Sequence, residues 1–187
     1  KRGAPMDLMY LGHANFRPVD HGELVYAAHY TAENVRVRTS IPSHISPPEG
    51  YVDLIDALAK DPTGHHKFDP DIGFDPEVVF AVDMIAGDDG WTHAMQKHPS
   101  GISDFISYQP EQAPVTGRWL CRTEDQQGLG IAFPATSGVE GYHAEKEKGL
   151  YVELAAKDSW HISMRMGALD EDGTKAMEQS INNIAGR

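Results

Sequence analysis

The fold class is decided by the stretch Trp160-His161-Ile162-Ser163-Met164-Arg165-Met166-Gly167-Ala168. Large apolar side chains alternate here with polar or small ones, and a period of two is the pattern of a strand with one buried face. The segment 35–41 repeats the pattern, because valine and isoleucine alternate there with arginine and serine. Both segments therefore predict β-strands.

Weaker strand patterns recur along the rest of the chain, at 24–30, 77–85, 92–97, 102–109, 117–123, 129–133 and 150–154. Turns rich in glycine, proline and aspartate separate them, as in Gly87-Asp88-Asp89-Gly90. Apolar residues at helical spacing predict one or two short helices, at 51–60 and 174–185. Many short strands with frequent turns predict a mainly β protein, an antiparallel sandwich or barrel, and residues 1–187 read as a single domain.

Composition excludes several classes of partner. The chain carries 16 basic and 28 acidic residues, a net charge of −12, so we expect no nucleic-acid partner. No apolar run approaches the ~20 residues that span a bilayer, so we expect no membrane partner. The single cysteine, Cys121, allows no internal disulfide, which suits a cytoplasmic protein. A long polar insertion lies at 60–76, where loops of this length are usually functional or mobile.

The ten histidines do not follow metal-binding spacings, and we find no His-x-His, His-x-x-x-His or Cys/His pattern. No phosphate-binding loop or dinucleotide fingerprint occurs either: Gly128-Leu129-Gly130 precedes a predicted strand rather than a helix. We therefore expect no metal and no cofactor.

The first segment carries the clearest candidate for chemistry. An apolar run, 5–11, leads to His13, and the carboxamide of Asn15 follows two residues later on the same side of the chain. Histidine changes charge near neutral pH, so it suits proton transfer, and a carboxamide can hydrogen-bond a hydroxyl group. The alternative is a histidine satisfied at the end of a strand.

Further motifs follow in order along nearly the whole chain: Pro5-Met6 with Tyr10-Leu11-Gly12-His13-Ala14-Asn15-Phe16, Asp75–Phe80, Pro114 with Trp119, Gly130–Thr136, Glu140-Gly141, Ala144-Glu145-Lys146 and Gly167–Asp170. Together they resemble a less studied branch of the aldose 1-epimerases, or mutarotases. The resemblance implies an antiparallel β-sandwich of the galactose mutarotase-like type. It also implies that His13 handles a proton at the anomeric centre of a sugar.

One departure from this family concerns the base. The resemblance places a glutamate on the strand 129–134, but Phe133 stands there, with Ala132 before it, and neither can take a proton. Other carboxylates would have to replace it, and Asp83, Glu140 and Glu145 are the candidates. Asp83 sits in an otherwise apolar strand, where a carboxylate needs a partner. A salt-bridged or edge-facing aspartate is the plainer interpretation of that residue.

Sugar binding also calls for a flat apolar surface. Trp119, next to Arg118, is the best candidate for stacking on a sugar ring, although a core tryptophan is an equal alternative. The predicted binding residues are therefore Asn15, Arg118 and Trp119.

Whole members of the family carry an additional N-terminal half that contributes an arginine and a second histidine to the site. The chain would then be the C-terminal portion of a longer sandwich, completed by a missing N-terminal segment or a homo-oligomer partner, or its site has been rebuilt. The expected function is epimerisation of a free monosaccharide or sugar derivative by His/carboxylate acid–base catalysis. The alternatives are a non-catalytic carbohydrate-binding module and a metal-assisted sugar isomerase or lyase, in which His13 or His65 would bind the metal.

Overall fold

The computed structural model describes residues 3–41 and 45–187. Two four-stranded antiparallel sheets face each other, and a separate two-stranded ribbon extends from them. One sheet has the order β10-β6-β5-β2 and contains β2 (Glu23–Tyr26), β5 (Thr92–Lys97), β6 (Ser103–Tyr108) and β10 (Met164–Leu169). The other has the order β3-β4-β7-β8 and contains β3 (Val35–Val37), β4 (Phe74–Val82), β7 (Val115–Arg122) and β8 (Gln127–Ala135).

The core lies between the two sheets. Tyr26 and Ile106 come from the first sheet, Phe80 and Ile131 from the second, and none of these side chains is more than 1% exposed. The side chains on these inner faces follow the period of two that the sequence shows. The architecture is thus the mainly β antiparallel sandwich that the sequence predicts.

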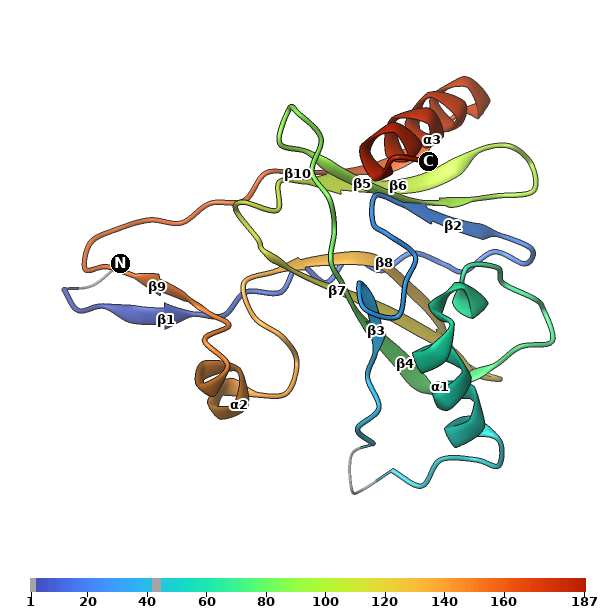
Figure 1. Ribbon diagram of the computed structural model, residues 1–187, viewed down its shortest axis with the longest axis horizontal. Coiled ribbons are helices and arrows are strands. Elements are labelled where there is room, and N and C mark those ends of the chain that lie inside the picture. The colour runs from blue at the N-terminus through green and yellow to red at the C-terminus, as the bar shows by residue number, and fades with distance from the viewer. Residues whose placement is uncertain (1–2, 42–44) are drawn as a thin grey trace.

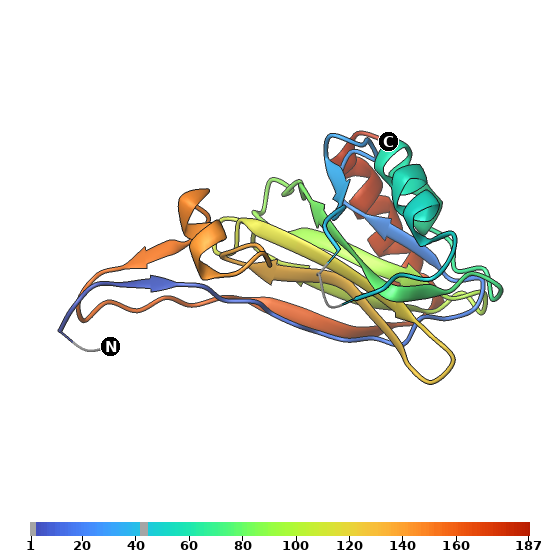
Figure 2. The ribbon, with the colours of Figure 1, turned by 90° about the horizontal axis from the view of Figure 1, so that it is seen from below.

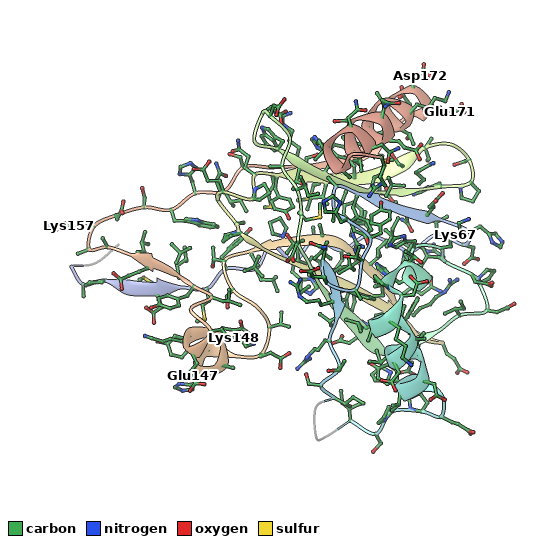
Figure 3. The ribbon with its side chains drawn as sticks, viewed as in Figure 1. Lys67, Glu147, Lys148, Lys157, Glu171 and Asp172 are labelled. Carbon is green, nitrogen blue, oxygen red and sulfur yellow. The ribbon has the colours of Figure 1, made fainter. Side chains whose placement is uncertain are left out.

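Two of the helices match the predicted helical patterns. The helix α1 (Tyr51–Lys60) coincides with the predicted range 51–60. The helix α3 (Glu171–Ala185) starts before the predicted 174, because the carboxylate of Asp170 accepts a hydrogen bond from the N–H of Gly173 at 2.8 Å. Glu171 and Asp172 in its first turn also suit the positive end of the helix (Figure 3). The short helix α2 (Tyr142–Glu147) was not predicted.

The helix α3 covers the outer face of the β10-β6-β5-β2 sheet (Figure 1). Its fully buried Ile181 packs there in a cluster with Val25, Ala27 and Met95. Within residues 3–41 and 45–187, none of the helices combines the length and the apolarity that crossing a bilayer requires.

The insertion at 60–76 packs against the sandwich. It contains the 3-10 helix η1 (Pro62–His65), and both His65 and Phe68 are buried. Its backbone pairs with the chain around β2: the N–H of Leu24 donates to the carbonyl of His66 at 2.7 Å, and that of Phe68 to Gly22 at 3.0 Å. Much of this segment therefore belongs to the fold.

The strand predicted at 160–168 is shorter than its alternation suggests. It begins only at Met164, because this residue pairs with Tyr108, the last residue of β6, and two of the residues before it bond Gln112 instead. The side chain of Gln112 accepts a hydrogen bond from the N–H of Ser163 at 2.7 Å, and the backbone carbonyl of Gln112 accepts one from the indole N–H of Trp160 at 3.0 Å. The alternation of side chains continues through residues 160–163, although the backbone pairing with β6 starts only at Met164.

The first strand, β1 (Met6–Leu8), pairs with β9 (Val152–Leu154) in an antiparallel ribbon. Figure 2 shows this ribbon projecting from the two sheets, next to α2. After β1 the chain turns along β8, with bridges between Leu11 and Ala135 and between Phe16 and Leu129. This path brings the segment 11–16 to the edge of the β3-β4-β7-β8 sheet.

Candidate functional site

Strand alternation sorts the candidate residues onto the two faces of the β3-β4-β7-β8 sheet. On β4, Val78, Phe80 and Val82 are buried between the sheets. The intervening residues, Glu77, Val79 and Ala81, face outward, and the ladder pairs Val79 with Trp119. The outward face of this sheet therefore carries Trp119, and the inward face carries Arg118.

An aromatic cluster lies on the outward face. The ring of His13 lies 4.1 Å from that of Phe133 and 5.7 Å from that of Trp119, measured between ring centroids. His13 is exposed, Trp119 is partly exposed and Phe133 is buried beneath them. We call these three side chains the aromatic platform. It joins the proton-carrying residue and the stacking residue that the sequence predicts.

Two glycines on β8 make room for the platform. A Cβ atom placed on Gly128 would lie 2.3 Å from the Trp119 ring, and one placed on Gly130 would lie 2.0 Å from the Phe133 ring. Any side chain at either position would displace a ring. The rings therefore occupy the space beside these two glycines that a side chain would fill.

A β-bulge brings Phe133 onto this face. The ladder pairs Gly117 with Phe133 and Trp119 with Gly130, so β8 has one residue more than β7 over this interval. Because of the extra residue, Gly130 and Phe133 lie on the same face although they are three apart in sequence. The aromatic side chain that replaces the expected carboxylate thus contacts His13 directly.

The segment that carries His13 is fixed to β8 by its backbone. The N–H of Gly12 donates to the carbonyl of Pro134 at 2.8 Å, and Phe16 exchanges two hydrogen bonds with Leu129 at 2.8 and 2.9 Å. Between these anchors, His13 and Asn15 are exposed. The predicted pair therefore lies at the edge of the outward face, held at both ends.

A carboxylate that the sequence did not single out also lies at the platform. The indole N–H of Trp119 donates to Oε2 of Glu77 at 2.7 Å, and the glutamate is exposed. Glu77 lies on β4, two residues before Val79. The alternation of β4 could have revealed it, because Glu77 is in phase with the outward-facing positions.

The three predicted carboxylates lie elsewhere on the same face, around a groove of about 380 Å³. Its floor consists of outward-facing residues of β4 and β7, including Val79, Ala81, Val115 and Gly117. Loop 137–140 and α2 form one wall, with Lys148 at the end of that helix (Figure 3). The groove is the place where Asp83, Glu140 and Glu145 come together.

Each of these carboxylates already has a cationic partner. Arg36 donates to both oxygens of Asp83, at 2.6 and 2.7 Å, which agrees with the salt-bridged interpretation of this residue. Arg38 donates to both oxygens of Glu140, at 2.6 and 3.0 Å, and so connects β3 to loop 137–140. The groove therefore presents donors and acceptors side by side.

Glu145 differs from the other two because it is 1% exposed. Its Oε1 accepts hydrogen bonds from the N–H of Glu140 at 3.0 Å and from Lys148 at 3.2 Å. Its Oε2 has no hydrogen-bond partner within the described residues and lies against Gly138. The residue supports loop 137–140, and through Glu140 it supports the wall of the groove.

Arg118 is not brought together with the other predicted residues. Its side chain is 1% exposed and lies between the sheets. It donates to the carbonyl of Ile131 and to Nε2 of His65, both at 2.9 Å, and its guanidinium lies 3.7 Å above the ring of Tyr26. Trp119, one residue later, faces the opposite way, so a ligand on the platform does not reach Arg118.

The buried histidine beside Arg118, His65, has a lowered pKa. Burial, reinforced by the charge of Arg118, holds the pKa of His65 well below its usual value. Its Nδ1 bonds the carbonyl of Pro62, so Nε2 is left to accept from Arg118. His65 therefore has both ring nitrogens occupied. In the described part of the chain, no three His, Cys, Asp or Glu side chains gather as a metal ion would require.

Comparison with known proteins supports the fold. The sandwich is similar to a solved structure described as a "putative aldose 1-epimerase" from Klebsiella pneumoniae subsp. pneumoniae, with a TM-score of 0.76 and 18% sequence identity. The similarity covers 98% of this chain and 44% of that one, so the chain spans less than half the length of this neighbour. No family model and no curated protein matches the sequence. The chain therefore shares the antiparallel β-sandwich fold of this structure, as the resemblance implies.

Proposed function

We propose that the chain binds a sugar on the outward face of the β3-β4-β7-β8 sheet and exchanges its anomers as an aldose 1-epimerase. The observation that carries the proposal is the platform: exposed His13 lies beside the partly exposed ring of Trp119, whose indole bonds the carboxylate of Glu77. An aromatic ring can stack on the C–H face of a pyranose. Proton carriers at its edges can then reach the hydroxyl groups and the ring oxygen.

Anomer exchange needs one base and one acid. The base takes the proton of the C1 hydroxyl, the bond from C1 to the ring oxygen breaks, and the acid protonates that oxygen. The open aldehyde rotates about its bond to C2, and the reverse steps close the ring on the other face. We assign the ring-oxygen proton to His13, following the resemblance, and the hydroxyl proton to Glu77, the carboxylate at the platform.

Asp83, Glu140 and Glu145 remain alternative bases, but their positions favour them less. Asp83 and Glu140 each hold an arginine through both oxygens. Glu145 is buried and holds the backbone of loop 137–140. All three line the groove next to the platform. We expect Asp83 and Glu140 to bind hydroxyl groups rather than to accept the proton, and Glu145 to support loop 137–140.

Magnetisation-exchange NMR over a panel of aldoses tests the activity, because it measures anomer interconversion directly. We expect His13→Gln and Glu77→Gln each to slow the catalysed rate by ~10²–10⁴-fold, the usual contribution of one acid–base group. His161→Gln, at an exposed position, is the matched control and should leave the rate unchanged. A catalysed rate that survives both site substitutions would contradict the assignment.

A second candidate function, sugar binding without catalysis, is favoured by one observation. The apolar ring of Phe133 contacts His13 where the resemblance places the carboxylate base. If Glu77 does not take over that role, sugar should bind saturably while anomer exchange stays at its uncatalysed rate. Titration by NMR, run beside the exchange measurement on the same aldoses, separates the two functions.

A further inference from the structure

The platform and the groove are continuous on the outward face, and we call the surface that runs along β7 from Val115 to Trp119 the lane. On β7, Val115 and Gly117 line the groove, and the next outward-facing residue is Trp119. On β4, the ladder pairs Ala81 with Gly117 at the groove and Val79 with Trp119 at the platform. The two features therefore follow one another along the same two strands.

The length of this lane exceeds one sugar ring. From Val115 to Trp119 the strand advances four residues, which corresponds to about 13 Å at the usual rise of an extended chain. One pyranose ring is shorter than this, and two linked rings are comparable to it. The groove by itself, at about 380 Å³, is already the size of a small-molecule site. A single ring on Trp119 would leave the groove empty.

The two ends of the lane also differ in chemistry. The platform offers aromatic rings, His13 and the carboxylate of Glu77. The groove offers an apolar floor between ion pairs, with the Arg38–Glu140 pair crossing from β3 to loop 137–140. Paired donors and acceptors beside an apolar floor suit a second ring with its hydroxyl groups and C–H face. Neither end duplicates the other.

We propose that the ligand is a saccharide of at least two linked rings, with its reducing ring on the platform and the next ring in the groove. The inference rests on the proposed function for its sugar chemistry. The orientation follows from His13, because the ring whose free C1 exchanges must lie at the platform. The linkage then points along β7 toward Val115.

Isothermal titration with free hexoses and with their reducing disaccharides tests the proposal. The probes are glucose with maltose, cellobiose and lactose, each of which has glucose as its reducing ring, and galactose with a galactobiose. We expect at least one disaccharide to bind ~10-fold tighter than its parent hexose, a gain equivalent to ~1.4 kcal/mol. Ala81→Phe, at an exposed position on the groove floor, should fill the groove and abolish this gain without changing hexose affinity.

Three further variants sharpen the test. Val115→Phe fills the groove from β7 and should act like Ala81→Phe, so a folding defect in one variant does not remove the test. Trp119→Ala should weaken hexose and disaccharide alike. Trp91→Ala is the matched control, because Trp91 stacks on Arg165 of the other sheet, at 4.2 Å, and should change neither affinity.

The outcomes separate this proposal from the one before it. Hexose binding with no gain for any disaccharide would overturn the two-ring proposal alone. The same holds if Ala81→Phe and Val115→Phe weaken the hexose as much as the disaccharide. Failure of every sugar to bind would overturn both proposals.

Discussion

Arg118 and Trp119 are adjacent in the sequence, yet they occupy opposite faces of the same sheet. On the inward face, the guanidinium of Arg118 lies above Tyr26 and bonds the Ile131 carbonyl and His65. On the outward face, Trp119 bonds one exposed carboxylate and leaves part of its ring open to solvent. The inward groups are held by one another, whereas the outward groups retain surface that a ligand can use. The polar residues of one sheet thus divide into those that maintain the fold and those available for binding.

The inward face should respond most strongly to substitution. Arg118→Ala removes the hydrogen bonds to Ile131 and His65 and leaves a cavity, so we expect a loss of about 3–5 kcal/mol in the free energy of unfolding. Arg118→Met fills much of the space and removes a buried charge, which should make its loss smaller. Urea denaturation of both variants measures the difference. A loss below ~1 kcal/mol for Arg118→Ala would contradict the greater sensitivity of the inward face, because surface substitutions cost that little.

The buried His65 and the half-buried His66 should make the inward face sensitive to acid. Burial, with the charges of Arg118 and Arg187, lowers the pKa of His66 to about 3 from the usual 6.5. Between these values the unfolded chain binds a proton that the folded chain does not. Stability should therefore fall as the pH falls below 6.5, by up to ~1.4 kcal/mol per pH unit for each such histidine.

Denaturation midpoints measured from pH 7 to pH 4.5 give the slope. His66→Gln should make it shallower, and His161→Gln, at an exposed position, should leave it unchanged. Equal slopes for His66→Gln and the unsubstituted chain would show that His66 titrates alike in both states.

The outward face should show a smaller effect on stability and a larger one on local structure. In Gly130→Ala the new methyl group meets the ring of Phe133, so the ring must move, at a cost of about 1–3 kcal/mol. The imidazole resonances of His13, which lies against that ring, should shift. Gly167→Ala is the control, because its Cβ would make only an ordinary contact at 3.7 Å with Phe105. Unchanged His13 resonances in Gly130→Ala would contradict the placement of the ring.

Local patterns predicted much of the fold. The strand β5 and the helix α1 have the predicted ranges 92–97 and 51–60, because turn residues bound the strand and an amphipathic pattern marks the helix. The short helix α2 escaped prediction because its Tyr142–Glu147 stretch carries no apolar stripe. The lead-in to β10 was predicted as strand because alternation continues where Gln112 replaces the ladder.

The candidate site was harder to predict, for a physical reason. Alternation puts Arg118 and Trp119 on opposite faces but does not say which face is inward, because either side chain could be buried. The bulge in β8 changes the face of every residue beyond it, and no feature of Gly130–Phe133 in the sequence marks it. The sequence indicates His65 only as a possible metal ligand, because its hydrogen-bond partner Arg118 is far away in the sequence. The apolar run before His13 and Asn15 marks this segment as a candidate site, but only the resemblance connects it with a sugar.

The glycines under the platform have a consequence for how such a site changes over generations. Because the Phe133 ring occupies the space where a Cβ of residue 130 would stand, residue 130 cannot gain a side chain while the ring is present. A lineage that replaces the ring with a smaller side chain frees residue 130 to accept alanine or serine, and one that keeps the ring must keep the glycine. In an alignment of related chains, positions 130 and 133 should therefore covary, as should 128 and 119.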